Sequence, residues 1–77
     1  MITTMERVTS IFRQQAPDVE VPEIVPEHRM QDLGIDSLTF VHILLQIEKD
    51  FAIEFSDEEL AVVESVQDIL DLVVQKA

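Results

Sequence analysis

The chain has 77 residues, 47% of them hydrophobic, and its 16 acidic and 5 basic residues give a formal net charge of −11. This length predicts one small domain, residues 1–77, without room for a nucleotide-binding fold plus a substrate domain. The hydrophobic share excludes a disordered acidic tail. The negative charge disfavours nucleic acid and anionic membranes as partners and favours basic protein surfaces.

The chain contains no cysteine, which excludes disulfides and any metal or nucleophilic site built on a thiol. Residues 1–10 lack the apolar core of a signal peptide, and no apolar run approaches the ~20 residues of a membrane span. We therefore expect a soluble, monomeric, cytoplasmic protein that does not bind membranes.

The first helix is expected to begin after Thr3 and to reach about Gln15. Thr3 followed by Glu6 is the pattern of a capping box, in which two side chains satisfy free backbone N–H groups. Pro17 ends the helix, because a residue before proline is pushed out of helical geometry. The apolar face of this helix consists of Val8, Ile11 and Phe12.

Residues 17–35 form a long connection that holds all three prolines. A stretch of this length without periodicity is unusual in a compact domain, so we expect apolar side chains to pin it to the helices. These side chains are Val19, Val21, Ile24, Val25 and Leu33. A short helical turn is expected to start at Pro26, since proline suits a first helical position.

The second helix is expected to run from Asp36, as its N-cap, to about Asp50, and it has two apolar stripes. At about 100° per residue, the stripe that faces the core consists of Phe40, Ile43, Leu44, Ile47 and Phe51. A second stripe, displaced by roughly 100–160°, consists of Leu38, Val41 and Leu45. One interpretation is that the short third helix covers this second stripe, and the other is that the stripe is exposed for a partner protein, rimmed by acids such as Glu48. Both can hold in part, for different residues of the stripe.

Residues 51–55 alternate in hydrophobicity and predict a brief extended connector. Its inward-pointing side chains are Phe51, Ile53 and Phe55. The short third helix follows, with Ser56 as its cap and Glu59 completing a second capping box, and runs through Leu60.

The last helix opens on the same pattern, with Ser65 and Asp68. Its apolar residues follow the i, i+3, i+4, i+7 spacing of one helix face, and they are Val66, Ile69, Leu70 and Val73. The chain is therefore expected to be all-α. We predict a small four-helix bundle with three main helices, a short third helix and a long first loop.

Ser37 lies in the first turn of the second helix, where free backbone N–H groups and the helix dipole favour an anionic group. A phosphate ester on its hydroxyl would be well placed there. Serine after a capping aspartate is also common at helix starts, so the spacing alone leaves a purely structural Ser37 open.

Residues 32–38, Asp-Leu-Gly-Ile-Asp-Ser-Leu, resemble the attachment motif of acyl carrier proteins and peptidyl carrier domains. The resemblance covers nearly the whole chain, through the acidic residues 57–59 to Ser-Val-Gln-Asp at 65–68. It implies that a phosphopantetheinyl transferase, using coenzyme A and Mg²⁺, attaches 4′-phosphopantetheine to Ser37. The thiol of that arm would hold an acyl or aminoacyl group as a thioester. The chain would be a carrier without catalytic residues, not an enzyme.

The same resemblance implies roles for the neighbours of Ser37. Asp36 would cap the helix and help to place the metal of the transferase, and Gly34 would permit the turn before the helix. The transferase and later partners would contact Leu38, Val41 and Leu45. Loading enzymes and downstream synthases or transferases with basic docking surfaces would contact Glu48, Asp57, Glu58 and Glu59.

Thr39 and His42 depart from the pattern of fatty-acid-synthesis carriers, which often have acids two and five residues after the serine. This favours a specialised pathway, such as polyketide synthesis. An aminoacyl or peptidyl carrier of a nonribosomal system remains an alternative, as does a non-covalent acidic adaptor that binds a partner helix. The sequence contains no plausible nucleophile–base pair and no glycine-rich phosphate-binding loop, so it does not indicate an enzyme. His28 and His42, each isolated, do not indicate a metal site.

Overall fold

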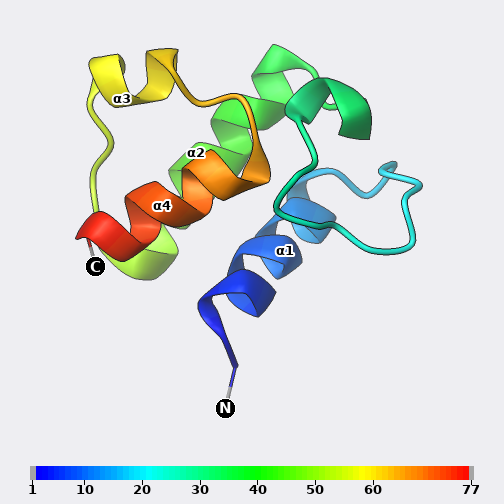
Figure 1. The fold of residues 1–77 in the computed structure, drawn as a ribbon, viewed down its shortest axis with the longest axis horizontal. Helices are drawn as coiled ribbons and strands as arrows, with labels where there is room; N and C mark the ends of the chain where they lie inside the picture. The colour runs from blue at the N-terminus through cyan, green and yellow to red at the C-terminus, as the bar shows by residue number, and fades with distance from the viewer. Residues whose placement is uncertain (1, 77) are drawn as a thin grey trace.

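The computed structural model describes residues 2–76. Its elements are α1 (Thr4–Gln15), the 3₁₀ helix η1 (Met30–Leu33), α2 (Ser37–Phe51), α3 (Asp57–Ala61) and α4 (Val66–Lys76). Figure 1 shows the short α3 standing apart, between the two connectors that lead from α2 and to α4. Within this range no strand forms, and no helix has the length and apolar character needed to cross a membrane. The predicted all-α fold, with three main helices and a long first loop, is confirmed.

The three predicted capping boxes all form. The hydroxyls of Thr3, Ser56 and Ser65 accept the backbone N–H three residues later at 3.0, 3.1 and 3.2 Å. In return, the acid at that later position accepts the N–H of the capping residue at 3.3, 2.8 and 3.1 Å. Because these bonds are local in the chain, the starts of α1, α3 and α4 were predictable from the sequence.

Asp68 at the start of α4 should make stability depend on pH. The backbone N–H of Glu64 is the main cause that holds the pKa of Asp68 below its ordinary value of 3.8. Since the pKa is lower in the folded state, the stabilisation is present at neutral pH and is lost as pH falls below 3.8. Asp68→Asn should therefore lower Tm by roughly 2–6 °C at pH 7, and this deficit should shrink progressively as pH falls below the ordinary value of 3.8.

Thermal melts of both proteins between pH 7 and pH 2.5 test this expectation. Asp18→Asn, which changes an exposed acid of the long loop, is the matched control and should differ little from the wild type at any pH. A deficit of Asp68→Asn that stays constant across the range would show that the carboxylate charge is not what stabilises the helix start.

The core lies among α1, α2 and α4. Its largest fully buried side chains are Phe12, Ile43, Ile47, Ile69, Val8, Val66 and Val73. Phe40 and Phe51, which were predicted in the core stripe of α2, are only partly buried and pack at the edge of this core. The Phe51 ring instead lies under the Arg7 guanidinium, 4.0 Å from ring centroid to Cζ. Arg7 also donates to the backbone oxygen of Asp50 at 2.8 Å, which joins α1 to the end of α2.

The long first loop is held by apolar side chains and by one arginine. Val19, Ile24 and Leu33 are buried, as expected, whereas Val21 and Val25 are partly buried. The guanidinium of Arg13 donates to the backbone oxygens of Val19 and Val21 at 3.2 and 2.7 Å. These bonds were not predicted, because nothing in the local pattern links an arginine of α1 to carbonyls of the loop.

The helical turn expected at Pro26 is wrong in position, since only an isolated turn forms there and the helical segment is η1, at Met30–Leu33. The reason is a pairing with the start of α4. The backbone oxygens of Pro26 and His28 accept the N–H groups of Gln67 and Val66, each at 2.9 Å. The Met30 N–H, which would bond back to the Pro26 oxygen in a helix, donates to the backbone oxygen of Glu64 at 3.2 Å instead.

The connector after α2 also differs from the prediction. Phe51 ends α2 rather than opening an extended segment, and Ala52 then reverses the chain with a φ of 55°. Phe55 is buried and Ile53 partly buried, as expected. The Glu48 carboxylate accepts the Phe55 N–H at 2.8 Å and so fixes the connector to α2.

Candidate functional site

Ser37 is the first residue of α2, and it is exposed. The Asp36 carboxylate accepts the Thr39 N–H at 2.8 Å and thereby supplies the helix cap. In the described part of the chain, the Ser37 hydroxyl makes no hydrogen bond, whereas the hydroxyls of Ser56 and Ser65 are occupied as caps. Ser37 is therefore a helix-start serine whose hydroxyl is available for chemistry.

Asp36 places a negative charge directly beside Ser37. Hydrogen bonds from the backbone and side chain of Thr39 are the main causes that hold the pKa of Asp36 below its ordinary value, with a smaller contribution from the charge of His42. Asp36 is consequently ionised at neutral pH. An anion at this end of a helix is favoured by the helix dipole, so the charge both stabilises α2 and is available to attract a cation brought by a partner.

Gly34 adopts the left-handed conformation that the turn before α2 requires, with φ 68° and ψ 26°. A Cβ at this position would meet no atom within 4 Å, so the requirement concerns backbone conformation rather than space. The Ile35 N–H then bonds back to the Met30 oxygen at 3.2 Å. The predicted role of Gly34 agrees with this geometry, in which the turn directs the chain into α2.

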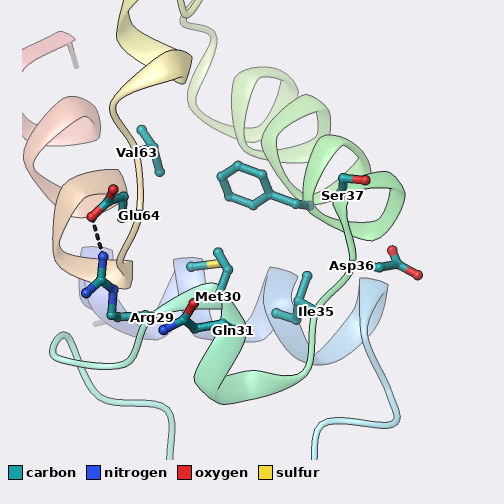
Figure 2. A pocket seen from close by; sticks show the side chains of 9 residues that line it. Arg29, Met30, Gln31, Ile35, Asp36, Ser37, Val63 and Glu64 are labelled. Carbon is teal, nitrogen blue, oxygen red and sulfur yellow. Dashed lines mark hydrogen bonds and ion pairs between the residues drawn. The ribbon is translucent and has the colours of Figure 1, made fainter.

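A groove of about 350 Å³ opens beside Ser37. Its apolar wall is formed by Met30, Ile35, Phe40 and Val63, and its polar lining by Arg29, Gln31, Asp36, Ser37 and Glu64. Figure 2 shows Asp36 and Ser37 at one end of this groove and Arg29 and Glu64 at the other. The groove was not predicted, because it is built from four separate segments of the chain.

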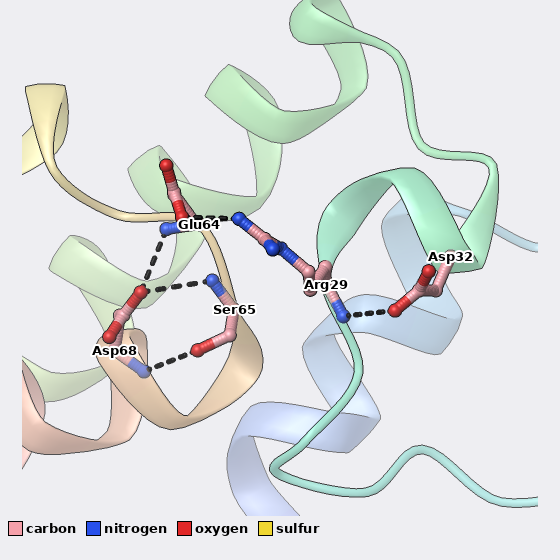
Figure 3. Close-up of polar contacts among 5 residues, drawn as sticks. All are labelled: Arg29, Asp32, Glu64, Ser65 and Asp68. Atoms are coloured by element: carbon pink, nitrogen blue, oxygen red, sulfur yellow. Dashed lines mark hydrogen bonds and ion pairs between the residues drawn. The ribbon is translucent and has the colours of Figure 1, made fainter.

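The Arg29–Glu64 ion pair joins η1 to the start of α4 across 35 residues of sequence. The backbone N–H of Arg29 also donates to the Asp32 carboxylate at 3.0 Å, and the backbone N–H of Met30 donates to the backbone oxygen of Glu64 at 3.2 Å. Figure 3 shows the contacts of Arg29 with Glu64 and Asp32, beside the capping box of Asp68. These contacts hold the two walls of the groove together.

The second apolar stripe of α2 is exposed. Leu38, Val41 and Leu45 are 66%, 48% and 50% exposed. The interpretation in which the third helix covers them is therefore wrong, because Leu60 of α3 packs toward the core instead. Val62, 72% exposed just after α3, is a further exposed apolar residue that the periodicity did not single out.

The four acids predicted to contact partners fall into two kinds. Asp57 and Glu58, in the first turn of α3, are exposed. Glu59 is half-buried, pairs with Lys76 at 2.9 Å and has a lowered pKa, chiefly because of the hydrogen bond from the backbone of Ser56. Glu48, as noted, accepts a bond from the connector after α2. Asp57 and Glu58 are thus the better placed for contacts with another protein.

The two histidines occupy different surroundings. His42 is exposed on α2, whereas the Nδ1 atom of His28 accepts the Val25 N–H at 3.1 Å within the long loop. Among residues 2–76, no three His, Asp or Glu side chains are grouped in a way that could hold a metal ion.

Comparisons with known proteins cover most of the chain. A family profile described as a phosphopantetheine attachment site matches residues 6–73. The chain is 36% identical over 73 residues to an acyl carrier protein of Thermosynechococcus vestitus, which covers 94% of this chain and 89% of that protein. An acyl carrier protein structure from Thermotoga maritima matches with a TM-score of 0.79 at 24% identity, over 91% of this chain and 81% of the other. This match to a solved structure shows the fold.

Proposed function

Because the chain belongs to the acyl carrier protein family, whose members are carriers and not enzymes, we propose that it carries acyl intermediates on Ser37. In this family, 4′-phosphopantetheine is attached covalently to a serine. The observation that supports Ser37 is its exposed hydroxyl in the first turn of α2, free of any capping bond and directly after the ionised Asp36. Its place within residues 32–38 agrees with the attachment motif.

The prosthetic arm supplies a terminal thiol on which cargo is held as a thioester, a group that this cysteine-free chain lacks. The residues of the chain present the attachment point. Gly34 directs the chain into α2, Asp36 sets the start of the helix and attracts the metal of the transferase, and Leu38 offers an apolar contact beside the hydroxyl. Partners are a phosphopantetheinyl transferase and acyl-handling enzymes, for which basic docking surfaces are expected. The monomeric state and the cytoplasmic location stay predictions.

Intact mass spectrometry tests the attachment site. The wild type, incubated with a broad-specificity phosphopantetheinyl transferase, coenzyme A and Mg²⁺, should gain a single phosphopantetheine, and Ser37→Ala should gain none. Ser10→Ala is the matched control, since Ser10 is also an exposed helical serine, and it should be modified like the wild type. A folded wild type that gains no mass would instead support the non-covalent adaptor.

We further propose that the carrier serves a specialised pathway rather than housekeeping fatty acid synthesis. The support lies in the early part of α2, where Thr39 is half-buried and His42 is exposed, so that neither position adds negative charge beside Ser37. Charged residues at the rim of an interface act mainly on the rate of encounter and on partner choice. Loading of an amino acid by an adenylating enzyme, without acyl loading, would favour the aminoacyl alternative.

Adding the two acids tests this proposal. The double variant Thr39→Asp, His42→Glu should raise kcat/KM with a malonyl transferase of fatty acid synthesis by roughly 2- to 30-fold, and the gain should shrink at high salt. The control is Gln14→Glu, Gln75→Glu, which adds two acids at exposed positions on α1 and α4 and should have little effect. A wild type that already reacts as fast as the carrier of that pathway would contradict the proposal.

A further inference from the structure

The groove beside Ser37 has a mixed chemical lining. One wall is apolar. Asp36 and Ser37 lie at one end, and the remaining polar groups are a guanidinium, a carboxamide and a carboxylate, from Arg29, Gln31 and Glu64. A purely hydrocarbon occupant would cover these polar groups without offering them hydrogen bonds, which is unfavourable. An occupant with amide groups separated by short apolar segments would satisfy both parts of the lining.

We propose that this groove binds the pantetheine portion of the prosthetic arm, with the Arg29–Glu64 pair and Gln31 hydrogen-bonded to its amide groups. This inference rests on the proposed attachment at Ser37. Pantetheine offers two amides, a hydroxyl and apolar methyl and methylene groups, so it matches the lining group by group. The volume of about 350 Å³ lies at the small end of the roughly 300–1,000 Å³ range of small-molecule pockets, which favours the arm over a long cargo.

The ion pair suits a neutral amide. An amide carries both a donor and an acceptor, so its carbonyl can accept from Arg29 while its N–H donates to Glu64, and neither charge has to be displaced. The side chains of Arg29 and Glu64 are 49% and 66% exposed. Exposed pairs of this kind are weakly held, so the pair can adjust to an inserted group.

The position of Ser37 also allows the arm to run along the groove. In Figure 2 the Ser37 hydroxyl is directed away from the Arg29–Glu64 pair. Serine interconverts among staggered rotamers about a single bond, and the exposed side chain of Ser37 is not held by a hydrogen bond in residues 2–76. A group esterified there can therefore turn back along the groove toward Met30 and Val63.

Nuclear magnetic resonance on the apo and holo proteins tests the inference. In the wild type, modification should shift the side-chain N–H signals of Arg29 and Gln31 and produce nuclear Overhauser contacts between the arm's geminal methyl groups and Met30 or Val63. In Arg29→Met these contacts should weaken, and alkylation of the arm's thiol by a neutral maleimide should become roughly two- to fivefold faster. Lys49→Met removes the same charge from an exposed position on α2 outside the groove, and should behave as the wild type.

The outcomes separate this inference from the function on which it rests. Normal mass addition without shifts or contacts in the groove would overturn the arm-binding inference alone. Equal thiol reactivity in the wild type and Arg29→Met would do the same. Failure of the folded wild type to gain any mass would overturn the attachment at Ser37 and this inference with it.

Discussion

Phe12→Ala is expected to unfold a large part of the protein population at room temperature. Phe12 is 0% exposed and lies at the centre of the core. Truncating a fully buried phenylalanine costs about 3–5 kcal/mol through lost burial and the cavity left behind. The single hydrophobic core of a domain of about 70–80 residues rarely supplies more than about 3–5 kcal/mol of stability, so the cost is comparable to the whole stability of a chain this short.

Urea unfolding followed by far-ultraviolet circular dichroism measures this effect. Phe51→Ala is the informative comparison, because its ring is only partly buried and lies at the edge of the core under Arg7. We expect a clearly smaller loss from it, of about 1–2 kcal/mol. Equal losses from the two variants would show that the edge of the core is as well packed as its centre.

This contrast shows where sequence reasoning succeeds and where it stops. The capping boxes and the periodic faces are local, and they placed the starts of all four α-helices and most of the core. The depth to which a residue of the core-facing stripe is buried depends on the neighbouring helices. For this reason Phe40 and Phe51 were predicted to be buried but are only partly buried. The turn at Pro26 was misplaced for the same reason, since its carbonyl pairs with a distant segment.

The candidate site likewise has one part that the sequence predicts and one part that it does not. Ser37, Asp36 and Gly34 could be predicted because the attachment motif is contiguous, and the geometry of the turn and cap agrees with it. The Arg29–Glu64 pair joins residues far apart in sequence, and no periodic or local pattern relates them. The groove could not be anticipated for that reason. The two interpretations of the second stripe also required the position of α3, which the sequence does not determine.

Leu38→Ala is expected to slow modification of Ser37 by the transferase strongly while leaving the fold intact. Leu38 follows Ser37 directly and is 66% exposed, so an enzyme that reaches the hydroxyl must also cover this side chain. Anchoring residues at the centre of an interface contribute about 2 kcal/mol or more, which corresponds to a loss of roughly 30-fold in kcat/KM. An exposed side chain contributes little to folding, so the free energy of unfolding should change by less than about 0.5 kcal/mol.

Initial rates of mass addition and thermal melts, measured on the same samples, separate the two effects. Val74→Ala is the matched control: Val74 is 68% exposed, close to the value for Leu38, but it lies on α4. Its modification rate should equal that of the wild type. If Leu38→Ala were also modified at the wild-type rate, the apolar strip would not be the contact for the transferase. The exposed acids Asp57 and Glu58 would then be the stronger candidates, and recognition would depend steeply on salt concentration.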